Sequence, residues 1–224
     1  MKTIAVIGAG VTGVTTAFVL SELGYKVTVF EKQRYPSIVT SYANGGQLSA
    51  SNAEVWNHFG TILKAVTWLL KKDAPLKINF WPSWHKVSWL AEFLLQTKNY
   101  KKNTIQTVKM AIESRKYMQK IVDDAGIEFD KSNCGILHIY KSHREFEHAH
   151  RVNELLALGG LERRRLTENE ILTIEPNLEK KFVGGYYTKT DSTGDIHKFT
   201  SHLARVAMDR GVNFQQNADV KSIK

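Results

Sequence analysis

Near the N-terminus, the hydrophobic positions change from a short continuous run to a helical spacing. Residues 4–7 are apolar without interruption, as in a buried strand. Apolar residues then recur over residues 11–18 at the i, i+3 and i+7 positions of one helix face, and Gly24 stands where a left-handed helix cap is wanted. A second apolar run at residues 26–30 has strand character. We therefore expect a strand–helix–strand unit over these first 30 residues.

The same stretch has a second interpretation. Lys2 precedes an uncharged segment from Thr3 to Ser21, which is also typical of a secretory signal peptide. The second strand at residues 26–30 favours the strand–helix–strand unit instead. We accordingly expect no cleaved signal peptide and a cytoplasmic location, either free or peripheral on the inner face of the cell membrane.

The turn between the expected strand and helix reads GAGVTG, with glycines at positions 8, 10 and 13. Gly8 permits a tight turn, Gly10 lets the backbone approach a pyrophosphate, and Gly13 lets the helix pack closely on the strand. Glu31 ends the second strand, 18 residues after Gly13, and is placed to accept hydrogen bonds from ribose hydroxyls. The pattern predicts a dinucleotide cofactor, with NADP disfavoured because Glu31 repels a 2′-phosphate, and does not separate FAD from NAD. The expected cofactor-binding residues here are Ile7, Gly8, Ala9, Gly10, Val11, Thr12, Gly13, Glu31 and Lys32.

Seven later segments resemble one family, the FAD-dependent D-amino acid dehydrogenases of the D-amino-acid-oxidase-like flavoproteins. They are Thr40–Ser49 (TSYANGGQLS), Leu63–Trp68, Asp73–Leu76, Glu175–Leu178, Gly184–Tyr186, Asp191–Asp195 and Phe199–Arg205. The resemblance runs along the whole chain, and the segments at 40–49 and 191–205 are its most specific parts. It implies that the dinucleotide is FAD.

The resemblance also implies residue roles and a reaction. The flavin would be contacted by Ser41, Asn44, Gly45, Gly46, Gln47 and Leu48, and the adenine by the main chain of Val220 within a strand at 219–223. A D-amino acid would lose its α-hydrogen as hydride to flavin N5, and the imino acid would hydrolyse to a 2-oxo acid and ammonia. A quinone of the respiratory chain, or another acceptor, would then reoxidise the flavin. No side chain is assigned to catalysis; the substrate candidates are His58, Tyr187 and Asp195.

Members of this family are about twice as long as these 224 residues, so the chain resembles their N-terminal half. The expected fold is α/β, with a Rossmann-like FAD-binding part at 1–50 and 185–224 and an inserted mixed α+β substrate region at 51–184. The C-terminal half of the family fold, with its later glycine motif and carboxylate-binding arginine, would be absent. Two alternatives stay open: a glycine- or sarcosine-type flavin oxidase, and a non-catalytic remnant or subunit that needs a complementary C-terminal chain.

Charge and tryptophan content suggest a partner surface. The formal net charge is +9, and all five tryptophans lie between Trp56 and Trp89. Apolar residues at helical spacing within 62–70 and 87–94 accompany a lysine-rich composition. Such helices either contact an anionic membrane through residues 56–102 or pack over the substrate region. No nucleic-acid-binding motif accompanies the charge, so we expect no nucleic-acid partner.

No metal site is expected from sequence. His143, His148 and His150 do not share a helix face within the helix predicted from about Ser142, so we interpret them as solvent-facing. The arginine run at residues 163–165 is likewise interpreted as solvated. Cys134 is the only cysteine, which excludes a disulfide framework and any multi-cysteine metal site. The remaining strong patterns predict a long helix over 104–125 and a strand over 135–140.

Overall fold

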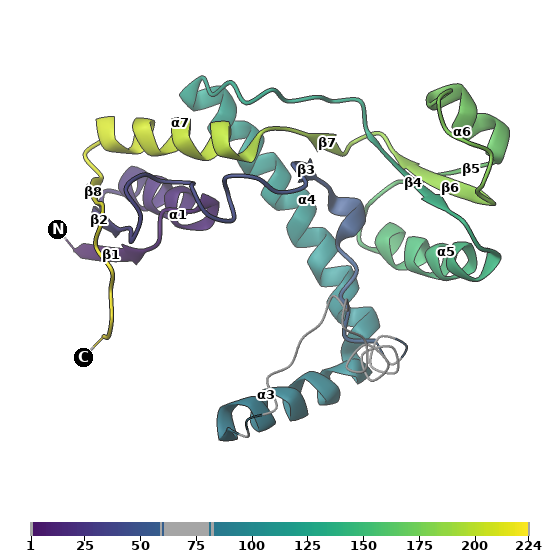
Figure 1. Ribbon diagram of the computed structural model, residues 1–224, viewed down its shortest axis with the longest axis horizontal. Coiled ribbons are helices and arrows are strands. Elements are labelled where there is room, and N and C mark those ends of the chain that lie inside the picture. The colour runs from purple at the N-terminus through teal and green to yellow at the C-terminus, as the bar shows by residue number, and fades with distance from the viewer. Residues whose placement is uncertain (1, 59, 61–80, 82, 224) are drawn as a thin grey trace. The chain divides into compact units, whose positions relative to one another are not determined.

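The computed structural model describes residues 2–58, 60, 81 and 83–223 (Figure 1). The chain forms two compact units. The first comprises residues 1–49, 114–136 and 189–224, and the second comprises residues 50–113 and 137–188. The long helix α4 (Tyr100–Ala125) contributes its first part to the second unit and its last part to the first.

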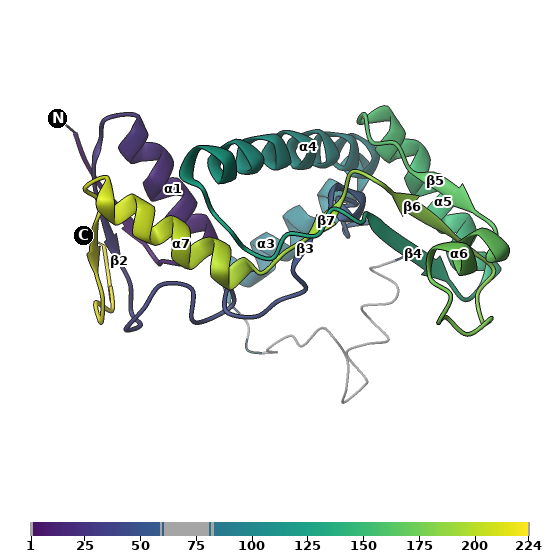
Figure 2. The ribbon, with the colours of Figure 1, turned by 90° about the horizontal axis from the view of Figure 1, so that it is seen from above.

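The first unit contains a parallel sheet in the order β1–β2–β8. Its strands are β1 (Thr3–Ile7), β2 (Lys26–Phe30) and β8 (Asn213–Gln215). Helix α1 (Val11–Glu22) connects β1 to β2, and α7 (Ile196–Asp209) runs beside α1 in both views (Figures 1 and 2). Gly24 has a φ of 81° just after α1, as the cap requires. The predicted strand–helix–strand unit is therefore confirmed.

A single hydrophobic cluster holds the first unit together. Its buried members come from the glycine turn, α1, β2, the segment after α4, α7 and the turn before β8: Ala9, Val14, Ala17, Phe18, Val27, Val29, Ile127, Phe129, Phe199, Leu203, Ala204, Ala207 and Val212. The last turns of α4 pack against this cluster through Met118, Ile121, Val122 and Ala125. Residues 114–136 therefore belong to the first unit, whereas the sequence placed them in the inserted region. The apolar face of α4 is the physical reason.

A short antiparallel pair completes the first unit. β3 (Gln47–Leu48) pairs with β7 (Ser192–Thr193), and Ser132 forms a bridge to Thr193. The N–H of Gly194 donates to the carbonyl oxygen of Gly46 at 2.8 Å. These bonds fix the segment around residues 44–48 against the chain that leads into α7.

The second unit is built around a sheet in the order β4–β6–β5. Its elements are η1 (Ala50–Asn52), α3 (Trp84–Leu95), η2 (Gln96–Asn99), β4 (Ile136–Tyr140), α5 (His143–Leu158), β5 (Arg164–Leu166), α6 (Glu168–Ile174) and β6 (Gly184–Thr188). Ser142 caps α5 by accepting from the N–H of Glu145. The predicted long helix, the strand near 135–140 and the helix after Ser142 are all confirmed.

Helix α3 confirms the predicted helix around residues 87–94, and none of its residues is buried. The helix face predicted within residues 62–70 lies outside the described residues. Across the described part of the chain, no helix is both long enough and apolar enough to cross a membrane.

The predicted strand at 219–223 is wrong. The chain leaves the sheet after β8 through Asn217, whose φ is 55°. The N–H groups of Asn217 and Ala218 then donate to the carbonyl oxygens of Gln33 and Glu31. Residues 219–223 have no strand partner among the described residues, so the apolar alternation there forms no ladder.

Candidate cofactor site

The glycine-rich turn has the backbone that the sequence requires. Gly8 has a φ of 95°, a left-handed value that glycine adopts without steric cost. A Cβ on Gly13 would lie 1.9 Å from the carbonyl oxygen of Gly8, so only glycine lets α1 approach the turn this closely. Gly10, the residue before α1, provides no side-chain cap, and the positive end of the helix favours an anion.

Glu31 connects the end of β2 to this turn. Its side chain is buried, with 9% of the residue exposed. Oε2 accepts from the N–H of Ala9 at 2.6 Å, and Oε1 accepts from the N–H of Gln33 at 2.8 Å. Each carboxylate oxygen has a second lone pair, so Glu31 is fixed in place and keeps capacity to accept from ribose hydroxyls.

A loop at residues 37–41 closes over the turn. The N–H of Ser37 donates to the carbonyl oxygen of Ala9 at 3.0 Å, and Ser41 Oγ accepts from the N–H of Val11 at 3.0 Å. Ser37 also donates through its hydroxyl to the carbonyl oxygen of Ser41. A cavity of about 140 Å³ opens here, lined by Gly10, Glu31 and residues 37–41. Ser41 is therefore placed to release the Val11 N–H and to donate its hydroxyl to a phosphate bound at the start of α1.

The segment predicted to run along the flavin forms a bend that the side chain of Asn44 stabilises. Asn44 Oδ1 accepts from the N–H of Gly46 at 2.8 Å. A Cβ on Gly46 would lie 2.7 Å from the carbonyl oxygen of Gly194, whereas nothing stands within 4 Å of a Cβ on Gly45. A smaller cavity of about 50 Å³ is lined here by Asn44, Gly46, Gln47, Leu48, Met118, Phe129, Gly194 and Ile196. Glycine is thus required at position 46 and only tolerated at position 45.

Two predicted contacts lie at the margin of the site. Lys32 is exposed and pairs with the Asp219 carboxylate at 3.5 Å. Asp219 also accepts from Lys221, and this hydrogen bond lowers the pKa of the Asp219 carboxyl below its ordinary value. Val220 follows in irregular chain and is 38% exposed. A contact between the main chain of Val220 and adenine remains a prediction, although the strand expected around Val220 does not form.

The three substrate candidates have separate surroundings. Asp195 caps α7, where its carboxylate accepts from the N–H of Lys198 at 2.9 Å, and this bond lowers the pKa of the Asp195 carboxyl. Tyr187 lies on β6 opposite Arg164 and packs beside a small apolar cluster. His58 stacks edge-on to Tyr100 in the second unit. Asp195 therefore stabilises the start of α7, and a substrate role for each of the three residues remains a prediction.

Several polar residues have partners that the sequence did not indicate. His148 contacts Glu54 at 3.2 Å, and His150 Nδ1 lies 3.0 Å from the hydroxyl of the buried Tyr186. The guanidinium of Arg163 lies over the Tyr186 ring. The side chains of His148 and His150 are 41% and 43% exposed, and Arg163 is half-buried, so each residue combines contact with solvent and a specific partner. Their partners come from distant parts of the chain, so no local spacing could reveal them.

The residues around the glycine turn fit a dinucleotide cofactor. A helix that begins after a glycine, a glycine turn that admits no Cβ at position 13, a buried fixed carboxylate and an adjoining cavity occur together. These features suit the pyrophosphate and ribose of a dinucleotide. Comparison with known proteins then decides which one: a family model described as FAD dependent oxidoreductase matches residues 3–224.

The chain belongs to this FAD-dependent oxidoreductase family.

Members of the family with assigned names are similar along the whole chain. D-amino acid dehydrogenase 3 from Mesorhizobium japonicum is 53% identical over 224 residues, which cover 100% of this chain and 54% of the relative. D-amino acid dehydrogenase from Paramagnetospirillum magneticum is 37% identical, with 98% of this chain and 54% of the relative covered. The chain thus spans about half the length of the curated relatives it matches.

Solved structures share the family fold. A glycine oxidase from Geobacillus kaustophilus superposes with a TM-score of 0.62 at 19% identity, covering 97% of this chain and 47% of the oxidase. An L-proline dehydrogenase from P. horikoshii gives a TM-score of 0.63 at 18% identity, covering 98% and 45%. At this identity the likeness shows the fold alone, and it confirms the predicted α/β class. The family model confirms FAD as the cofactor of the family.

Proposed function

We propose that this chain is the FAD-binding N-terminal part of a D-amino acid dehydrogenase. The observation that carries the proposal is the 53% identity, along the whole chain, with a relative of that name. Three structural features also support it: the turn at Gly8–Gly13, the buried Glu31 carboxylate and the cavity beside them.

Different residues of the first unit would bind different parts of FAD. The N-terminus of α1 and the N–H groups after Gly10 would bind the pyrophosphate, and Glu31 would accept from the adenosine ribose. The backbone around Gly46 would lie against the isoalloxazine ring of the flavin. Its antiparallel pairing with the chain at Ser192–Gly194 would hold it in place there. When bound, FAD supplies the acceptor for the hydride that leaves Cα of a D-amino acid, whose imino product hydrolyses to a 2-oxo acid and ammonia.

We propose that the groups which bind the substrate carboxylate come from a complementary C-terminal segment. The support is the length comparison, because the chain covers 54% of the relatives that carry the dehydrogenase name. A bidentate arginine is the natural partner of a carboxylate. Two arginines of the first unit, Arg115 and Arg210, already pair with Asp191 and Glu22.

A membrane acceptor is the third part of the proposal. Helix α3 exposes Trp84 and Trp89, at 84% and 55%, and the neighbouring Trp81 is 81% exposed. Tryptophan and lysine on one exposed amphipathic helix suit an anionic lipid interface. We propose that this helix brings the protein to the inner face of the cell membrane, where a quinone would reoxidise the flavin.

The test is the visible spectrum of the purified chain after incubation with FAD and removal of the excess. A bound flavin band that bleaches on anaerobic addition of D-alanine would show that the chain binds cofactor and reacts. A bound band that does not bleach until the C-terminal half of a relative is added would support the need for a complementary segment. Failure to bind FAD, with or without that half, would contradict the proposal.

A matched pair of variants sharpens the binding measurement. Glu31→Gln removes the charge and one acceptor while keeping the shape, so the Kd for FAD should rise about tenfold, the equivalent of one charged hydrogen bond of ~1.4 kcal/mol. Glu128→Gln makes the same chemical change at an exposed position of the same unit and should leave the Kd unchanged. Equal affinities for the two variants would remove Glu31 from the cofactor site.

A further inference from the structure

Three potential metal ligands converge in the second unit. Glu54 and His58 follow η1, and His148 comes from α5. One ligand atom from each lies within 4.8 Å of the other two, and all three residues are half-buried. The Glu54 Oε1 to His148 Nε2 distance is 3.2 Å, and the rings of His58 and His148 are 5.3 Å apart.

The donor set and its spacing match what a divalent transition metal takes. Two imidazole nitrogens and one carboxylate oxygen are the ligands of many zinc sites with three protein ligands. Metal–ligand distances of about 2.0–2.1 Å in a tetrahedron place neighbouring ligand atoms ~3.4 Å apart. The Glu54–His148 distance is already close to this value, and His58 needs to move its ring by little more than an ångström to reach it.

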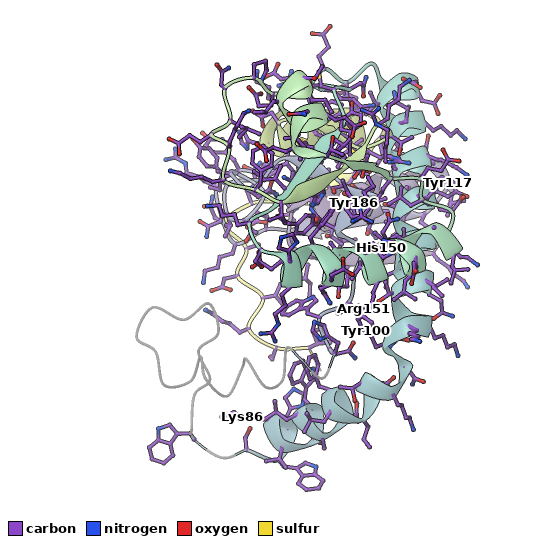
Figure 3. The ribbon with its side chains drawn as sticks, turned by 90° about the vertical axis from the view of Figure 1, so that its right-hand side faces the viewer. Lys86, Tyr100, Tyr117, His150, Arg151 and Tyr186 are labelled. Carbon is purple, nitrogen blue, oxygen red and sulfur yellow. The ribbon has the colours of Figure 1, made fainter. Side chains whose placement is uncertain are left out.

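Further residues orient the carboxylate from outside the cluster. Tyr100, at the start of α4, donates its hydroxyl to Glu54 Oε1 at 2.6 Å. Arg151, three residues after His148 on α5, is close enough to interact electrostatically with Tyr100 (Figure 3). Such outer hydrogen bonds are typical of carboxylates that bind metals.

A cavity adjoins two of the three ligand residues. A cavity of about 240 Å³ is lined by Glu54 and His148 together with Ser51, Asn52, His138, Tyr140, Ala149, Val152 and Arg163. A metal held by three side chains would therefore have a free coordination position for water or a small ligand, unlike a closed structural site with four protein ligands.

We propose that Glu54, His58 and His148 form a binding site for a divalent transition metal of the zinc class. The site is independent of the FAD site, because all of its ligands belong to the second unit. It combines Glu54 and His58, four residues apart, with a histidine from a helix nearly one hundred residues later.

Isothermal titration of the chelator-treated chain with Zn²⁺, in the absence of FAD and D-amino acids, tests the proposal. We expect one Zn²⁺ per chain. His148→Ala and Glu54→Gln should each raise the Kd at least tenfold, and Glu54→Asp should recover part of the affinity because it restores a carboxylate. Co²⁺ should give visible absorption bands of a four-coordinate ion, and His58→Ala should alter them.

His143→Ala is the matched control, because His143 is an exposed histidine on the same helix. It should bind Zn²⁺ as the unaltered chain does. The proposal is overturned if the unaltered chain binds no stoichiometric Zn²⁺, if Glu54→Gln binds as tightly as the unaltered chain, or if His143→Ala loses as much affinity as His148→Ala. Far-ultraviolet circular dichroism of each variant separates loss of ligand from loss of fold. Failure here leaves the FAD proposal untouched, since neither flavin nor substrate enters the measurement.

Discussion

The Arg115 guanidinium donates to the Asp191 carboxylate at 2.9 Å, and the Asp191 side chain is completely buried. The same Arg115 nitrogen donates to the carbonyl oxygen of Thr190, and Ser49 Oγ donates to the other Asp191 oxygen. The pair therefore ties the last part of α4 to the chain on either side of β3 and β7. These strands hold the segment proposed to meet the flavin.

Arg115→Ala should lower the free energy of unfolding. Removing one partner of a buried pair costs about 3–5 kcal/mol because the other charge stays buried. Since the Arg115 side chain is 25% exposed, we expect a smaller loss, of about 2–3 kcal/mol. Urea denaturation measures it, with Lys120→Ala, an exposed change on the same helix, as the control. A loss no greater than that of Lys120→Ala would mean that water replaces the arginine.

Gly13→Ala should both destabilise the first unit and weaken FAD binding. The added Cβ meets the Gly8 carbonyl oxygen at 1.9 Å, so α1 must move off the turn that it helps to form. Overpacking of this kind costs about 1–3 kcal/mol. Gly45→Ala has open space around its Cβ and should change stability by less than about 0.5 kcal/mol. Thermal melts and FAD titration of both variants check this, and comparable effects at the two positions would contradict it.

Asp195→Ala should lower the urea midpoint at neutral pH, because α7 loses the side chain that accepts from the Lys198 N–H. The folded pKa of Asp195 lies below its ordinary value near pH 4, so its contribution is full above that pH and is lost as pH falls through the folded pKa. The two proteins should therefore converge in stability below pH 4. Asp195→Asn should retain most of the cap. Asp209→Ala, at the other end of α7, should not lower the urea midpoint in this way at neutral pH. If the difference in stability between Asp195→Ala and the unaltered chain grows on acidification, Asp195 is not the cap.

Replacing Trp84 and Trp89 together with serine should reduce flotation of the chain with acidic liposomes severalfold. Each ring offers a large apolar surface that lies exposed on α3. Tyr117→Ser provides an aromatic control, since Tyr117 is 66% exposed on α4. The proposed membrane contact fails if the unaltered chain does not float, or if the tyrosine and tryptophan changes have equal effects.

What the sequence predicted well is local. The strand–helix–strand unit depends on apolar spacing over 30 residues and on Gly8 and Gly13, whose roles follow from neighbours in the chain. The helix cap at Ser142 is local in the same way. In each case the interacting atoms lie within a few turns of one another, so spacing alone carries the information.

What the sequence did not predict is long-range. Spacing along the helix cannot indicate the contact of His148 with Glu54, 94 residues earlier. The strand expected around Val220 has suitable residues, and no strand among the described residues pairs with it. The division of α4 between two units depends on which core its apolar residues meet. Nothing within α4 itself marks the change between Glu113 and Ser114.

The parallel pairing of β2 with β8 has a consequence for how the protein is made. Thr28 faces Asn213 across this pair, so the sheet that holds the glycine turn needs residues that lie far apart in the sequence. During synthesis, β1, α1 and β2 emerge first and must wait for β8 before Val29 meets Phe214. Contacts so distant in sequence form slowly because a long loop has to close. Until α7 and β8 have been made, the nascent glycine-turn segment therefore has an open sheet edge and an uncovered α1, the stage at which a chaperone would matter most.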